Sequence, residues 1–284
     1  MRHHYIPCFY TKRWTGNDNR LCQYSRPHTK VVAKRVFPAG TGYVDDLYAI
    51  PNVPMDKKHL LETQFMKQID QKASDILRKL ENGKLKLLTP EERYYWATFL
   101  ISLTQRSPEK IYEHIIKAQN VLHDVMLTRR DTYQLKRTND DPETFEEFVQ
   151  NAIDIGFFEQ ATMLLIQDTI RIPTTINLIS KFYWSVFTFN DYNHRLLTSD
   201  RPIVMSNGLG QSDGYIALPL APRTLFLAAR TAEITRKILA NPRLAEKTNE
   251  AVTCQAHQYV YGTDDAQLVF VEKRIAQEKT SISN

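Results

Sequence analysis

The chain has 284 residues, of which 42% are hydrophobic and 24% charged, an ordinary composition for a soluble globular protein. Its formal charge of +5 permits an anionic partner such as nucleic acid without requiring one. No apolar run approaches the roughly 20 residues that a membrane helix needs, and no secretory signal is apparent, so we expect a cytoplasmic protein without a membrane partner. Three cysteines, odd in number and far apart, are expected to be reduced thiols.

The first fourteen residues, MRHHYIPCFYTKRW, are rich in aromatic side chains and contain the adjacent pair His3 and His4. Disordered chain ends are usually polar and small, so this segment should be integral to the fold. Two short strands are predicted next, at residues 21–25 and 30–36. Residues 38–54 are rich in turn-forming side chains and are predicted to form an ordered loop.

Helices dominate the middle of the sequence. Residues 60–80 place apolar side chains three and four positions apart, the spacing of an amphipathic helix. A capping box of Thr89 and Glu92 opens a helix whose residues 94–103, YYWATFLISL, are apolar on nearly every side and should be buried. A further helix is predicted at residues 108–130, and a polar segment at 129–141 follows it. A shorter helix is predicted up to residue 153, and residues 157–181 are helical in character with a break at Pro173.

Short β-type runs begin near residue 182, and five of them between residues 182 and 229 predict a meander. Two helices, at 231–239 and 241–257, and a last strand at 267–271 are expected to follow. Strands at both ends of a helical middle predict one α+β domain over residues 1–284. In it, a central helical bundle (about 60–181) packs on a mainly antiparallel sheet, to which a β-rich C-terminal part (about 182–272) contributes.

Several common enzyme signatures are absent from the sequence. There is no P-loop, no GxGxxG after a strand, no HExxH and no GxSxG, so an ATPase, a Rossmann dehydrogenase, a zincin or an α/β-hydrolase is not supported. The sequence has no CxxC pair, so a structural zinc site of the finger type is excluded. The spacing of Glu272 and Lys273 does not match a PD-(D/E)xK nuclease.

Four positions carry side chains suited to chemistry. His4 is a candidate base or metal ligand, and Glu62 lies at the start of a predicted helix beside its apolar stripe. Arg106 ends the apolar helix, so its guanidinium should lie near the interior, where it needs a carboxylate or a bound anion. Asp200 follows a predicted strand and precedes Pro202. Each has a structural alternative, namely packing, a helix-dipole contact, an ion pair, and hydrogen bonds to backbone amides, respectively.

His3, Gln105 and Ser199, which directly precede His4, Arg106 and Asp200 in the sequence, are expected to contact a substrate. The whole set suits metal-assisted or acid–base hydrolysis of a phosphoester, with a nuclease as the favoured case and Mg²⁺ or Mn²⁺ on Glu62 and Asp200. The alternative is a non-catalytic protein that recognises protein or nucleic acid, in which the same residues form a buried structural network. Convergence of His4, Glu62, Arg106 and Asp200 on one open cleft would favour the enzyme, whereas their dispersion, or a sealed network without a pocket, would favour the binding protein.

The motifs HHYIPxFY, ETQF, QRSP, TSDRPIV and LPLAPRTLFLA, in this order, resemble a bacterial family of unknown function, domain-of-unknown-function family 4238. The resemblance runs from Arg2 to about Gly262, although this chain has TKRW at residues 11–14 where the family pattern more usually runs Leu-x-x-Phe. Because the family is known by its motifs rather than by a reaction, the resemblance implies little about activity. The positions that match its pattern are His4, Pro7, Tyr10, Glu62, Arg106, Ser199, Asp200, Pro202 and Asn249.

Overall fold

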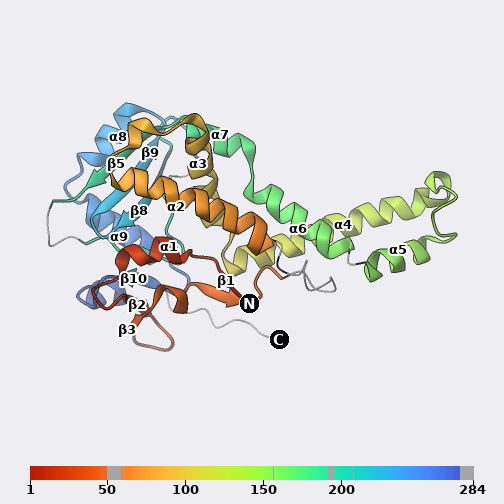
Figure 1. Cartoon of the computed structure of the whole chain (residues 1–284), viewed down its shortest axis with the longest axis horizontal. Helices are drawn as coiled ribbons and strands as arrows, with labels where there is room; N and C mark the ends of the chain where they lie inside the picture. The colour runs from red at the N-terminus through yellow and green to blue at the C-terminus, as the bar shows by residue number, and fades with distance from the viewer. Residues whose placement is uncertain (50–58, 60, 156, 191–194, 207, 276–284) are drawn as a thin grey trace.

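The computed structural model describes residues 1–49, 59, 61–155, 157–190, 195–206 and 208–275. A body of sheets and helices carries a long helical arm on one side (Figure 1). Helices and antiparallel sheets occur together in the body, which confirms the predicted α+β class. None of the helices in this described part combines the length and the apolar character needed to cross a bilayer.

Two four-stranded antiparallel sheets and a two-stranded ribbon contain the strands of the described chain. One sheet has the order β3-β2-β10-β6, the other has the order β5-β9-β8-β7, and β1 pairs with β4 in the ribbon. The first sheet therefore joins the two ends of the chain. The strands are β1 (Arg2–His4), β2 (Leu21–Ser25), β3 (Val32–Val36), β4 (Tyr43–Asp45), β5 (Tyr183–Thr188), β6 (Thr198–Ser199), β7 (Val204–Met205), β8 (Tyr215–Ala221), β9 (Thr224–Ala229) and β10 (Val260–Gly262).

The predicted meander is only partly correct. Strands β7, β8 and β9 are consecutive neighbours, but β6 leaves this sheet and pairs with β10 in the other one. The last strand was expected at residues 267–271, whereas this run forms helix α10 (Leu268–Glu272) and the strand lies earlier, at β10. A short apolar run does not distinguish a strand from a helical turn by its periodicity. Residues 50–54 of the predicted loop, and His194 in the predicted runs, lie outside the described residues.

The helices follow the predicted order. A π-helical segment, η3 (Leu61–Met66), leads into α2 (Lys67–Glu81), and the predicted first position, residue 60, lies outside the described residues. The 3₁₀ turns are η1 (Lys12–Trp14), η2 (Pro38–Gly40) and η4 (Leu85–Leu87). The other helices are α1 (Cys8–Thr11), α3 (Pro90–Gln105), α4 (Pro108–Lys136), α5 (Phe145–Asp154), α6 (Phe157–Ile170), α7 (Pro173–Ser180), α8 (Ala232–Leu239) and α9 (Leu244–Cys254).

Local signals placed most helix boundaries correctly. The backbone amide of Glu92 donates to Thr89 Oγ1 at 3.1 Å and that of Thr89 donates to Glu92 Oε2 at 3.0 Å, which is the predicted capping box. Pro173 begins α7 after the break that it was expected to cause. The polar segment expected from residue 129 is helical as far as Lys136, because α4 continues into the projecting arm, where its buried Tyr133 packs against Phe145 and Phe148 of α5.

Helix α3 is the centre of the body, as its apolar sequence predicted. Eight consecutive residues, from Trp96 to Leu103, are buried. The Trp96 ring lies 5.6 Å from that of Phe226 on β9, so α3 packs directly on the second sheet. Helices α2 and α7 pack beside it. This placement fixes the end of α3, and with it Arg106, at the interior of the body.

The N-terminal segment connects the two sheets. The Tyr10 hydroxyl is 2.6 Å from Thr198 Oγ1 on β6 and donates to the carbonyl oxygen of Pro219 on β8 at 2.7 Å. The indole of Trp14 donates to the carbonyl oxygen of Leu196 at 2.8 Å. Both aromatic side chains are fully buried, which confirms that this segment is integral to the fold. Cys8, Cys22 and Cys254 are free thiols, as expected.

Candidate functional site

An ion pair between α2 and the end of α3 lies at the centre of the candidate site. Arg106 Nη1 is 2.8 Å from Asp70 Oδ1, and the Arg106 side chain has 0% of its surface exposed. Its Nε and Nη2 atoms have no hydrogen-bond partner among the described residues. The prediction that Arg106 is buried and needs an anion is therefore confirmed, and Asp70 supplies only one contact to a group that offers five N–H donors.

Glu62 lies close enough to this ion pair to be influenced by both of its members. Burial raises the pKa of the Glu62 carboxyl to about 7, the nearby Asp70 carboxylate adds to the increase, and Arg106 opposes it. Oxygen Oε2 of Glu62 is buried and has no partner among the described residues. Glu62 stands in the π-helical segment η3, and such segments often occur at functional sites. The geometry thus places an acid that titrates near neutrality beside a buried cation.

Tyr48 connects this group to His3. The Tyr48 hydroxyl donates to the carbonyl oxygen of Arg106 at 2.9 Å, and its backbone amide donates to His3 Nδ1 at 2.8 Å. The two rings are stacked, with centroids 5.4 Å apart. His3, Tyr48, Glu62, Asp70 and Arg106 therefore form one continuous group, called here the Arg106 cluster.

A set of three potential metal ligands lies at the edge of the Arg106 cluster. The ligand atoms of His3, Asp46 and His59 all lie within 4.8 Å of one another. Burial, and then the neighbouring His59, lower the pKa of His3 to about 4, so its ring is neutral at pH 7. His3 Nδ1 accepts a hydrogen bond from the backbone amide of Tyr48, so in the neutral ring Nε2 carries the proton, which points to His59 Nδ1 at 3.1 Å.

A histidine that binds a metal usually donates a hydrogen bond from its other ring nitrogen, whereas His3 accepts one there. The arrangement of His3 therefore does not fit a metal at Nε2. What the geometry describes instead is a short hydrogen-bonded chain from Tyr48 through His3 to His59.

Asp200 serves a different group of residues. Its carboxylate accepts hydrogen bonds from three consecutive backbone amides, those of His257 at 2.8 Å, Gln258 at 2.6 Å and Tyr259 at 2.9 Å. Only 3% of Asp200 is exposed. Burial raises the pKa of its carboxyl, and the amide donors oppose the increase. The alternative interpretation of Asp200 as an acceptor for backbone amides describes this geometry, except that the amides come from a distant segment.

The segment that Asp200 holds carries a second polar pair. His257 Nε2 lies 2.8 Å from Glu109 Oε1, and Arg201 Nη2 lies 3.5 Å from Glu109 Oε2. These groups border a cavity of about 190 Å³, into which Tyr5 and Asp200 also face. The four predicted catalytic side chains are thus divided, with Glu62 and Arg106 in one cluster and Asp200 beside this cavity.

The remaining predicted site residues make local contacts. His4 lies on the opposite face of β1 from His3, with its ring centroid 5.6 Å from that of Tyr43, and burial lowers its pKa. Gln105 Oε1 lies 3.0 Å from His114 Nε2. Ser199 is fully buried, and its Oγ accepts the backbone amide of Arg201 at 3.2 Å. Unlike His3, these three residues do not belong to the Arg106 cluster.

Sequence reasoning missed Asp70, Tyr48, His59, Glu109 and His257. Asp70 was detectable, because it follows the buried Ile69 on a predicted amphipathic helix and the predicted buried arginine required a carboxylate. The other four come from loops or from a helix start, and no periodicity marks them.

The family comparison agrees with the motifs. The model of a family described as a protein of unknown function, DUF4238, matches residues 2–266. The chain belongs to this family. No curated protein and no solved structure matches it. In this DUF4238 member, Asn249 has a structural role: its Oδ1 accepts a hydrogen bond from the amide of Leu197 at 2.7 Å, and its Nδ2 donates to the carbonyl oxygen of Arg195 at 2.9 Å, which fixes the approach to β6.

Proposed function

We propose that this DUF4238 protein is an acid–base hydrolase of a phosphoester, with a nucleic acid as the favoured substrate and the Arg106 cluster as its site. The observation that carries the proposal is the carboxyl of Glu62, whose pKa is raised to about 7, next to a fully buried arginine. General acid–base catalysis is most efficient when the pKa of the catalytic group lies near the working pH. A phosphoester also develops negative charge that an arginine stabilises.

In this proposal Glu62 accepts a proton from the water that attacks phosphorus, the P–O bond to the leaving alcohol breaks, and Glu62 returns the proton to the leaving oxygen. The unpaired Arg106 nitrogens hold a phosphoryl oxygen. The unpaired Oε2 of Glu62 and the unpaired Nε and Nη2 of Arg106 support this, because buried polar atoms without partners are costly unless a ligand or water completes them. Asp70 orients the guanidinium through its single contact at 2.8 Å. Tyr48, and through it His3, keeps the end of α3 in place.

A divalent metal on Glu62 and Asp200 is not part of this proposal. These two carboxylates belong to different groups, and three amides already occupy the oxygens of Asp200. In this proposal Asp200 and His4 are positioning residues: Asp200 holds the amides of residues 257–259, and the His4 ring lies against that of Tyr43. Hydrolysis should therefore persist in EDTA without added Mg²⁺ or Mn²⁺.

One observation favours the non-catalytic alternative. The predicted catalytic side chains are dispersed between two polar groups, and Arg106 has 0% exposure and Asp200 has 3%, which is the arrangement expected of structural residues. In that case, the protein recognises its partner, protein or nucleic acid, through another surface. The two functions differ in what the loss of the Glu62 charge does.

The experiment is a hydrolysis assay on bis-p-nitrophenyl phosphate and on single-stranded DNA and RNA, with EDTA, Mg²⁺ or Mn²⁺. The proposal expects activity in wild type, a pH–rate profile with a limb near pH 7, and a loss of about 100-fold or more in Glu62→Gln. Glu91→Gln, an exposed carboxylate in the first turn of α3, is the matched control. No hydrolysis by wild type with any metal, together with a normal melting curve, would replace this function with the binding alternative.

A further inference from the structure

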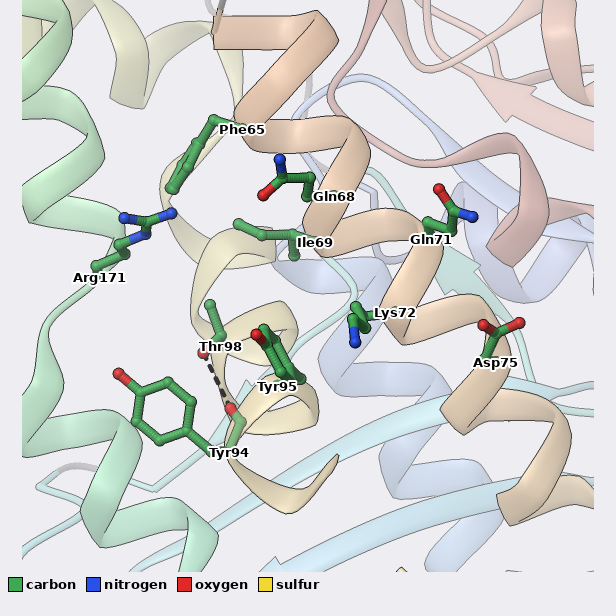
Figure 2. A pocket seen from close by; sticks show the side chains of 10 residues that line it. All are labelled: Phe65, Gln68, Ile69, Gln71, Lys72, Asp75, Tyr94, Tyr95, Thr98 and Arg171. Carbon is green, nitrogen blue, oxygen red and sulfur yellow. Dashed lines mark hydrogen bonds between the residues drawn. The ribbon is translucent and has the colours of Figure 1, made fainter. Parts of the chain in front are cut away.

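A groove of about 670 Å³ lies between α2 and α3, bordered on a third side by the residue that follows α6, Arg171 (Figure 2). This volume lies within the range of about 300–1,000 Å³ that is usual for small-molecule sites. Phe65 on η3 and Ile69 and Lys72 on α2 face the groove, whereas Asp70 of the Arg106 cluster is turned to a different face of α2. The groove is therefore distinct from the proposed catalytic site.

Aromatic rings and cations alternate along the walls of the groove. The guanidinium of Arg171 lies 4.6 Å from the centroid of the Phe65 ring, and the Lys72 ammonium lies 5.0 Å from that of Tyr95. Figure 2 shows Arg171 opposite Phe65, with Tyr94 and Tyr95 below them. Arg171 covers the Phe65 ring, which is only 4% exposed, so the half-buried rings of Tyr94 and Tyr95 are the ones that a planar ligand can reach. Each cation lies where it can meet the charge attached to such a ligand.

The fixed charge of the groove is positive. Lys72 and Arg171 are its cations, and Asp75, the acid among the lining residues, is ion-paired with Arg78 outside the groove. The side-chain amides of Gln68 and Gln71 also line it and offer donors and acceptors. Thr98 is already used, because its hydroxyl donates to the carbonyl oxygen of Tyr94 at 2.9 Å (Figure 2).

We infer that this groove binds a nucleotide unit, a planar heterocycle that stacks on the aromatic rings and carries a phosphate to Lys72 and Arg171. Base–aromatic stacking combined with a basic groove is the chemistry by which proteins bind single strands without strong sequence preference. The same chemistry accepts a free nucleotide. The inference does not rest on hydrolysis, since it concerns binding on a separate face of α2.

The test measures binding by calorimetry for free nucleotides and by fluorescence anisotropy for a labelled single-stranded oligonucleotide, both at low salt. AMP and UMP are compared with adenosine, which lacks the phosphate, and with ribose 5-phosphate, which lacks the ring. The inference expects each truncated probe to bind about tenfold or more weakly than the nucleotide. Binding of the oligonucleotide alone assigns the unit to a strand, and binding of AMP or UMP alone assigns it to a free nucleotide.

Three variants and one control decide whether the groove is responsible. Lys72→Gln, Arg171→Gln and Tyr95→Leu should each weaken binding by about tenfold, with melting curves close to wild type. Lys67→Gln, an exposed cation on α2 that does not line the groove, should leave it unchanged within about twofold. The inference is overturned if no probe binds wild type, or if Lys72→Gln and Arg171→Gln bind as tightly as Lys67→Gln does.

Discussion

Asp70 Oδ1 lies 2.8 Å from Nη1 of Arg106, and this is the hydrogen bond that α2 makes to the guanidinium at the end of α3. The pair joins the amphipathic helix to the central helix at a point where the arginine has no exposed surface. Burial raises the pKa of Asp70, and the charge of Arg106 opposes the increase. The negative charge of Asp70 balances the positive charge of Arg106, and this compensation makes the buried cation tolerable.

Asp70→Asn removes this compensation while keeping the side-chain volume. We expect the free energy of unfolding to fall by about 3–5 kcal/mol, because the variant leaves an uncompensated buried charge. Urea unfolding measures the change. Asp75→Asn on the same helix is the control, since its partner Arg78 is a surface residue and the expected loss is below about 1 kcal/mol. Equal losses in the two variants would show that the buried pair has no special weight.

The second prediction concerns how stability depends on pH. The pKa of Glu62 rises from its ordinary 4.5 to about 7 in the folded protein, so the folded state holds this proton more tightly than the unfolded chain does. The resulting stabilisation is complete below pH 4.5 and is lost as the pH rises from 4.5 through about 7. Glu62→Gln does not titrate and should not lose it.

The measurement compares the melting temperatures of Glu62→Gln and wild type across this pH range. The difference, variant minus wild type, should become more positive as the pH rises, and should level off above about 7. The raised pKa of Asp200, which belongs to a separate group, affects both proteins alike and cancels in the difference. A difference that is independent of pH would contradict the perturbed carboxyl.

Asp200→Asn tests whether this residue is primarily a positioning group. The amide side chain brings an NH₂ group against backbone N–H donors, so at least one of the three amides of residues 257–259 is left without a partner. We expect a loss of about 1–3 kcal/mol in unfolding free energy. Thermal melting beside Asp213→Asn, an exposed loop carboxylate, checks this. A variant that melts with wild type but abolishes activity would return Asp200 to the catalytic group.

Tyr10→Phe removes one hydroxyl that bridges the two sheets. The change leaves Thr198 Oγ1 and the carbonyl oxygen of Pro219 without this partner in a fully buried position, so we expect destabilisation by about 1–3 kcal/mol. Tyr183→Phe, on a residue that is 57% exposed, is the matched control and should be nearly neutral. The bridging role is refuted if chemical denaturation gives the two variants the same midpoint.

The helices were predictable because their signals are local. The capping box at Thr89, the proline at 173 and the apolar stretch from Trp96 each act within a few residues, and the structure has all three. The strand partners were not predictable in the same way. Thr198 of β6 pairs with Tyr261 of β10, although the strands before and after β6 in the sequence, β5 and β7, belong to the other sheet, and that choice depends on packing between distant segments.

The candidate site divides along the same line. Burial of Arg106 and its need for an anion followed from the composition of α3, and Glu62 followed from the start of a predicted helix. The assignment of Asp200 to the same group did not follow, because nothing in the residues around it indicates that its partners are the amides of residues 257–259. A carboxylate at the exit of a strand looks the same in sequence whether it faces a substrate or a loop.

The bridge made by Tyr10 also constrains the order of events during synthesis. Its two partners lie 188 and 209 residues further along the chain. The segment that carries Tyr10 and Trp14 therefore cannot complete these contacts until translation has passed residue 219. Contacts of such long sequence separation slow folding and prolong the exposure of apolar surface. The aromatic side chains of this segment thus stay accessible to solvent or to chaperones until β6 and β8 have been made.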